Sequence, residues 1–103
     1  MDKSVVSPDG LLELVIEKNE GDILIGFRGL PWHTHADILG QLYKLDDEAA
    51  VDRFIAQLVS GKSLICVLRK NRKIVDAWIT DNPSREKATE GEELEIRRWD
   101  ENI

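Results

Sequence analysis

The stretch DDEAAVDRFIAQLVSG, residues 46–61, determines the architecture that we predict for this chain. Its apolar side chains recur at the spacing of an amphipathic helix with one face toward a core. Asp46 or Asp47 can supply the N-cap, because a short carboxylate side chain accepts a hydrogen bond from a free backbone N–H of the first turn. Gly61 suits the residue just past the helix end. The predicted core residues of this helix are Phe54, Ile55 and Leu58.

Two strands and a shorter helix are expected before this segment. Alternation over residues 12–17 and again over 23–27, with Gly21 in the turn between them, predicts a hairpin. Residues 1–10 have no such pattern and are expected to form a loose lead-in. Pro31 interrupts the chain, and a first helix is expected from Thr34 or His35. The predicted apolar stripe of that helix is Ile38, Leu39, Leu42 and Leu45.

Three further strands are expected after Gly61, which completes the order β-β-α-α-β-β-β. They cover residues 64–68, 74–80 and 94–99, and Asn71-Arg72 is the expected turn between the first two. A chain of 103 residues suits one domain, here residues 1–103. We therefore predict an α+β fold, an antiparallel sheet of about five strands with two helices packed on one face.

The register of the hairpin around Asn71-Arg72 leads to a predicted interface. A two-residue turn pairs Leu68 with Val75 and Cys66 with Ala77, and we assign this face to the core. The opposite face, without helices, would then display apolar side chains that suit a protein interface, most simply a homodimer. The predicted interface residues are Ile65, Ile74, Trp78 and Trp99. The alternative is that long Arg and Lys side chains cover this face.

Charge is unevenly distributed along the chain. The formal net charge is −6, and residues 1–60 hold 11 acidic and 5 basic side chains. An acidic body disfavours nucleic acid and suits either a basic protein partner or simple solubility. The basic cluster Arg69–Lys73 is expected to be a solvated hairpin tip rather than a phosphate-binding site. No apolar run is long enough for a membrane span or a signal peptide, so we expect a cytoplasmic protein.

The segment from Trp32 to Asp37 is the densest cluster of functional residue types. In an extended chain, His33 and His35 point to the same side, where Asp37 could add a carboxylate. Such a group could bind a divalent metal or a small anion. The simpler interpretation is that the imidazoles cap backbone groups at a helix entrance and that Trp32 anchors the loop in the core. Because H-x-H is short and has no third histidine, we predict no metal and no other cofactor here.

Covalent catalysis finds no support in the sequence. The single cysteine, Cys66, lies between Ile65 and Val67 and is expected to be a small buried hydrophobe. No serine occupies a nucleophile elbow, and no glycine-rich phosphate loop is present. We predict no catalytic residues.

These observations favour a small acidic, non-catalytic protein-interaction domain, for example an inhibitor or immunity-type binding protein. The alternative is a small ligand- or metal-binding domain or enzyme that uses Trp32, His33, His35 and Asp37. A nucleic-acid-associated factor that uses the tip at Arg69–Lys73 is a third, weaker interpretation.

Overall fold

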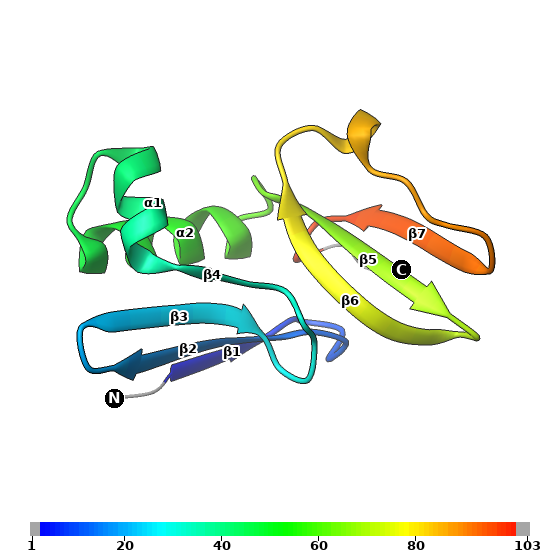
Figure 1. Cartoon of the computed structure of the whole chain (residues 1–103), viewed down its shortest axis with the longest axis horizontal. Coiled ribbons are helices and arrows are strands. Elements are labelled where there is room, and N and C mark those ends of the chain that lie inside the picture. Colours follow the sequence, from blue (N-terminus) through cyan, green and yellow to red (C-terminus); the bar gives the residue numbers. More distant parts are fainter. Residues whose placement is uncertain (1–2, 101–103) are drawn as a thin grey trace.

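The computed structural model describes residues 3–100, which form an α+β fold of two helices and seven strands in two antiparallel sheets (Figure 1). The order is β-β-β-β-α-α-β-β-β, with one short 3-10 turn before the last strand. The elements are β1 (Lys3–Val6), β2 (Glu13–Asn19), β3 (Asp22–Phe27), β4 (His33–His35), α1 (Ala36–Tyr43), α2 (Asp47–Val59), β5 (Leu64–Lys70), β6 (Lys73–Thr80), η1 (Pro83–Arg85) and β7 (Glu92–Arg97).

The first sheet has the strand order β1-β2-β3-β4. The predicted hairpin of β2 and β3 is confirmed, and Gly21 takes the positive φ of +72° that its turn requires. Its inward side chains, such as Leu14, Ile16 and Ile25, are buried. The expectation of a loose lead-in was wrong, because Lys3–Val6 pairs with β2 as an edge strand. Four residues are too few to show a periodic pattern.

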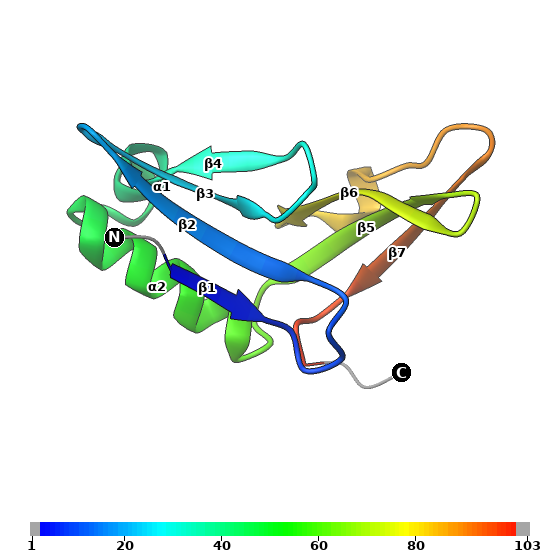
Figure 2. The same cartoon turned by 90° about the horizontal axis from the view of Figure 1, so that it is seen from below.

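The second sheet has the order β6-β5-β7, so the prediction of a single sheet of about five strands was wrong. The strand β4, where we expected a helix to begin, pairs with β3 and occupies an edge of the first sheet. In the second sheet, β7 pairs with β5 on the side opposite β6. Figure 2 shows the two sheets side by side, and both contribute to one hydrophobic core, for example through Leu14, Phe54 and Val67.

A β-bulge changes the register of the hairpin of β5 and β6. Asn71 and Arg72 form the predicted two-residue turn, both with positive φ, and Lys70 pairs with Lys73 as expected. The register then shifts by one residue, so that Val75 is the extra residue and Leu68 faces Asp76. The predicted pairs beyond the bulge were therefore wrong, and the faces of β6 are exchanged relative to β5.

Helix α1 buries a different face from the predicted one. It begins at Ala36 rather than at Thr34 or His35, and the Thr34 side chain is not its N-cap. The buried residues are the small Ala36 and Gly40, together with Leu39. A Cβ on Gly40 would lie 2.8 Å from the Leu45 carbonyl oxygen, so the glycine lets the following loop pack closely. Of the predicted stripe only Leu39 is buried.

Helix α2 is confirmed almost as predicted. The Asp46 side chain accepts a hydrogen bond of 2.8 Å from the Ala49 N–H, and Phe54 and Leu58 are buried, whereas Ile55 is half-buried against the core.

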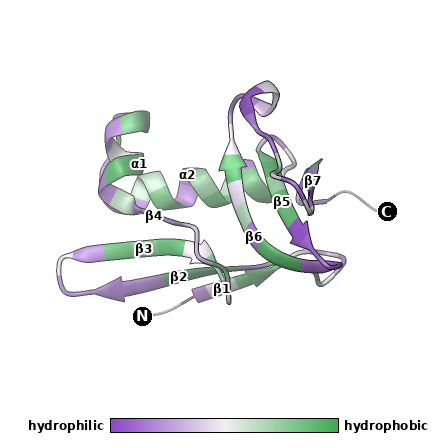
Figure 3. Ribbon diagram, turned by 45° about the vertical axis from the view of Figure 1, so that its right-hand side comes forward, coloured by the Kyte–Doolittle hydropathy of each residue, from purple (hydrophilic) through white to green (hydrophobic). Residues whose placement is uncertain are grey.

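Figure 3 shows hydrophobic residues along β3, β5 and β6, and hydrophilic residues at the hairpin turns. No helix within residues 3–100 is long and apolar enough to cross a membrane.

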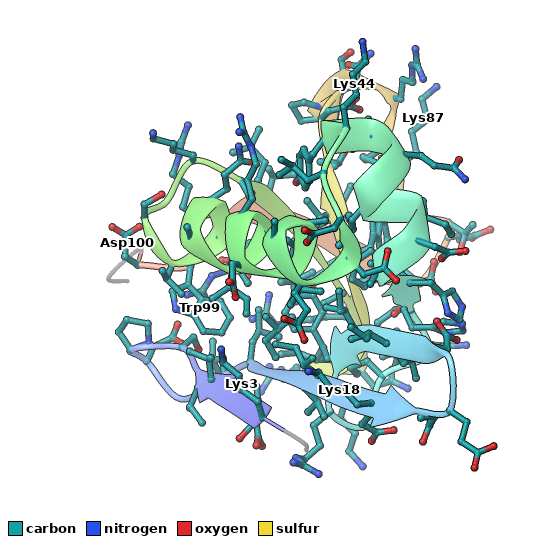
Figure 4. All side chains as sticks on the ribbon, turned by 90° about the vertical axis from the view of Figure 1, so that its left-hand side faces the viewer. Lys3, Lys18, Lys44, Lys87, Trp99 and Asp100 are labelled. Carbon is teal, nitrogen blue, oxygen red and sulfur yellow. The ribbon has the colours of Figure 1, made fainter. Side chains whose placement is uncertain are left out.

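The last strand, β7, faces the opposite way from the prediction. Leu94 is only half-buried and Ile96 is exposed, whereas Arg97 and Trp99 are buried. Trp99 lies between α2 and the first sheet (Figure 4). The Arg97 guanidinium forms an ion pair of 2.5 Å with the Asp9 carboxylate. This partner offsets the cost of burying the Arg97 charge.

Candidate functional site

The backbone of the Trp32 loop is held between β3 and β6. The Trp32 N–H donates to Asp76 Oδ1 at 3.1 Å, and the Trp32 ring lies 5.9 Å from the Phe27 ring between centroids. A Cβ on Gly26 would come within 2.9 Å of the Trp32 carbonyl oxygen, so this glycine permits the close approach of β4. The Trp32 side chain is half-buried against the core, and through these contacts it anchors the loop.

The two histidines lie on the same face of β4, as predicted. Their ring centroids are 5.3 Å apart, with the planes at 81°. His35 Nδ1 lies 2.9 Å from Asp22 Oδ2, and His33 Nδ1 lies 3.3 Å from the Pro31 carbonyl oxygen. Because a carboxylate and a carbonyl only accept hydrogen bonds, Nδ1 carries the proton in both rings. The carboxylate that orients His35 is thus Asp22, at the start of β3.

Asp37 does not join the histidines in a metal site. Its Oδ1 accepts a hydrogen bond of 2.9 Å from the Ile38 N–H, and its side chain is exposed at the start of α1. Within residues 3–100, no three His, Cys, Asp or Glu side chains are grouped so that they could hold a metal ion. The loop therefore supplies two imidazoles and the Trp32 ring, but Asp37 does not add a carboxylate beside them.

A cavity of about 250 Å³ adjoins the loop, between it and the outer face of β2 and β3. Trp32 and His33 line it together with Glu17 and Arg28, whereas His35 and Asp37 do not. Arg28 Nε is 2.8 Å from Glu13 Oε1, and this hydrogen bond lowers the pKa of the half-buried Glu13 carboxyl. Sequence reasoning did not place Arg28 beside the Trp32 loop, because Arg28 lies in the turn after β3.

The four residues of the predicted sheet interface do not share one exposed face. Ile65 and Trp99 are buried in the core, and Ile74 packs against its margin. Trp78 lies on the other face of β6, where its Nε1–H donates to Glu86 Oε2 at 3.0 Å. The bulge at Val75 and the reversed orientation of β7 explain this redistribution.

The segment after β6 covers the face of the second sheet that carries Cys66. The Glu86 carboxylate accepts hydrogen bonds from Trp78 and from Thr80 Oγ1, the latter at 3.0 Å. Cys66 is buried as predicted, although it faces this segment rather than the helices. Burial, with a contribution from Glu86, raises the pKa of the Cys66 thiol to about 11. The thiol is protonated at neutral pH and is a poor nucleophile.

Acidic side chains of β7 lie along the basic tip at Arg69–Lys73. Arg69 Nη1 is 2.5 Å from Glu95 Oε1, and in the strand register Lys70 lies opposite Glu92. These carboxylates offset part of the positive charge that the sequence concentrates in the tip.

Sequence reasoning missed the exposed apolar side of α1. Ile38, Leu42 and Leu45 are 54%, 71% and 39% exposed. Ile38 and Leu42 are spaced i and i+4 on α1, so they form one stripe, and Leu45 follows the left-handed C-cap Lys44 just past the end of the helix. Leu42 also lines a groove of about 400 Å³, whose other apolar walls are Tyr43, Phe54, Leu64 and Ile79. We call the stripe and this groove the α1 face.

The margin of the α1 face carries both signs of charge. The Arg53 guanidinium lies 5.4 Å from the centre of the Tyr43 ring, and burial raises the pKa of the Tyr43 hydroxyl. Lys62 and Asp81 line the groove. Asp37 precedes Ile38 in the chain, and Lys44 and Asp46 flank Leu45.

No protein family, curated protein or solved structure that we compared matches this chain. Any functional inference must therefore come from its own residues.

Proposed function

We propose that this chain is a small, non-catalytic protein-interaction domain that docks through the α1 face. The observation that carries the proposal is the exposure of Leu42, which is 71% exposed at the lip of an apolar groove. Fully burying a leucine or isoleucine side chain contributes roughly 1.5–3 kcal/mol. Ile38 and Leu42, one turn apart on α1, are both exposed and would gain stability from burial against a partner. Contiguous apolar surface of this kind marks docking sites.

The chemistry of the other candidate residues supports binding rather than catalysis. The Cys66 thiol is buried with a raised pKa, and both histidines hold their Nδ1 protons in hydrogen bonds at a strand edge. The acidic excess over residues 1–60 favours a basic protein for any further partner, as an inhibitor or immunity-type binding protein would have.

A photocrosslinking experiment tests the docking surface. Benzoylphenylalanine in place of Leu42, in the cells that produce the protein, should give covalent adducts on irradiation. The same group in place of Leu11, which is 46% exposed in a loop outside the α1 face, serves as the control and should give none. Adducts at Leu11 with none at Leu42 would refute the proposal, and so would no adduct at either position. The adduct mass also distinguishes a second copy from another protein.

A second candidate function is the binding of a small anion in the cavity beside Trp32. It is favoured by one observation, that Arg28 and His33 both line this cavity. Calorimetric titration with acetate and with inorganic phosphate tests it. Heat of binding that disappears in the His33→Ala variant would support an anion site, and no heat at neutral pH would remove this candidate.

A further inference from the structure

We infer that the α1 face docks a second copy of this chain, in a two-fold symmetric pair with the two α1 helices antiparallel. This inference rests on the proposed function and names its partner. Three features of the α1 face carry it: a knob beside a hole, a margin without net charge, and opposite charges at the two ends of one helix.

The knob and the hole are adjacent on the same surface. Leu42 protrudes from α1 and lines the groove formed with Phe54, Leu64 and Ile79. In a two-fold pair each residue contact occurs twice, because the same patch of both copies meets itself. An axis that crosses α1 near Gln41, next to Leu42, therefore places the leucine of each copy near the groove of the other. The chain thus provides both parts of a self-complementary contact.

The charge of the margin favours a second copy over a strongly charged partner. The margin contains three basic residues, Lys44, Arg53 and Lys62, and three acidic residues, Asp37, Asp46 and Asp81. Asp47 does not belong to this margin, since its carboxylate lies beside Gly40 on the buried side of α1. The chain as a whole carries −6, so two copies repel each other over most of their surface. The α1 face is a place where they meet without net repulsion.

The charges of α1 itself set the antiparallel direction. Asp37 lies in the first turn and Lys44 at the C-cap, and both are exposed. Figure 4 shows Lys44 at the free end of α1. When two copies of this helix lie antiparallel, Asp37 of each approaches Lys44 of the other. In this arrangement the two helix dipoles are antiparallel, which is also electrostatically favourable.

Sedimentation of the whole chain tests the inference. At about 100 μM the wild type should sediment with twice the 11.7 kDa mass of one chain and dissociate on dilution. Leu42→Asp should weaken the pair by roughly 100-fold or more, because the substitution occurs twice in each pair and each buried leucine contributes tenfold or more. Leu11→Asp, outside the α1 face, should leave the pair unchanged. Circular dichroism and thermal melting confirm that each variant is folded.

A charge exchange tests the antiparallel direction. Asp37→Lys and Lys44→Asp should each weaken the pair, and the double variant should restore it, because opposite charges then meet again in reversed positions. Aspartate suits position 44 because the backbone there is left-handed, with φ of 59°. Failure of the double variant to restore the pair would overturn the antiparallel arrangement.

Two outcomes would overturn the inference as a whole. One is a wild type that stays monomeric at about 100 μM. The other is a dimer that survives Leu42→Asp. In the first case, photocrosslinking from Leu42 to a protein of another mass would leave the proposed function standing with a different partner. No crosslink from Leu42 would remove the proposed function as well.

Discussion

Asp9 and Arg97 join the two ends of the chain through an ion pair of 2.5 Å between Oδ2 and Nη2, with the Arg97 side chain fully buried. Asp9 belongs to the loop between β1 and β2, and Arg97 ends β7. The pair thus connects the first sheet to the second. Ser7 Oγ and the Leu11 N–H also donate to the Asp9 carboxylate, at 2.7 and 3.1 Å.

Replacing Asp9 with Asn should destabilise the protein by roughly 2 kcal/mol, less than breaking a fully buried ion pair, because the Asp9 side chain is 20% exposed. The loss is expected because asparagine removes the negative charge that pairs with the buried Arg97 guanidinium. Urea denaturation measures the free energy of unfolding. Glu20→Gln, in the exposed β2–β3 turn, is the matched control and should stay within about 0.5 kcal/mol of wild type. A loss below about 1 kcal/mol for Asp9→Asn would show that the pair is not needed for stability.

The same carboxylate predicts acid sensitivity. Burial alone would raise the pKa of Asp9, but the hydrogen bonds from Ser7 and Leu11 and the Arg97 charge outweigh it and lower the pKa from 3.8 to about 2. A lowered folded-state pKa gives stability that is full above pH 3.8 and is lost as the pH falls through 2. The contribution is about 2 kcal/mol. Unfolding free energies from pH 6 to pH 2 should therefore fall more steeply in wild type than in Asp9→Asn. Equal slopes would contradict the assignment.

Gly40→Ala should destabilise the protein although alanine is the better helix former. An added Cβ would lie 2.8 Å from the Leu45 carbonyl oxygen, which is backbone and cannot rotate away. We expect a loss of about 1–3 kcal/mol, the usual cost of overpacking. Gln41→Ala, on the exposed side of the same helix, is the control. A gain of about 1 kcal/mol for Gly40→Ala, as in an isolated helix, would mean that α1 does not bury this face.

Cys66 should resist thiol reagents in the native protein at neutral pH. Its side chain is buried and its thiol pKa is raised to about 11, so very little thiolate is present or accessible. Labelling by a maleimide, followed by mass spectrometry, should require denaturant. A Ser84→Cys variant supplies an exposed thiol that reacts at once under the same conditions. Fast native labelling of Cys66 would contradict its burial.

The parts of the fold that follow from local pattern could be predicted from the sequence. The helix over 47–59 combines a regular apolar period with a cap at Asp46 and a stop at Gly61, and all three agree. In the hairpin turns, Gly21 and Asn71 are residue types that tolerate positive φ, whereas Arg72 takes positive φ although arginine does so less readily. These features depend on residues close together in the chain.

The remaining features depend on contacts between distant residues. The bulge at Val75 has no distinct signature, yet it exchanges the faces of β6. Helix α1 has two candidate stripes, and the tight loop at Gly40 selects the small one for burial. Arg97 is compatible with the core because Asp9 reaches it from the other end of the chain.

The candidate sites show the same division. The shared side of His33 and His35 follows from strand geometry, whereas the carboxylate that orients His35 comes from Asp22 at the start of β3. The α1 face could not be found in advance, because an apolar residue at helical spacing is more often buried than exposed.

Methyl NMR in the presence of a soluble gadolinium chelate tests most directly whether the α1 face is the docking surface. The chelate broadens the signals of solvent-exposed methyl groups. In dilute samples, Ile38, Leu42 and Leu45 should be broadened as strongly as Leu11. In concentrated samples, or with a partner identified by crosslinking, the methyl groups of Ile38, Leu42 and Leu45 should become protected while Leu11 stays broadened. Continued broadening of Leu42 in a sample that sediments as a complex would contradict docking through the α1 face.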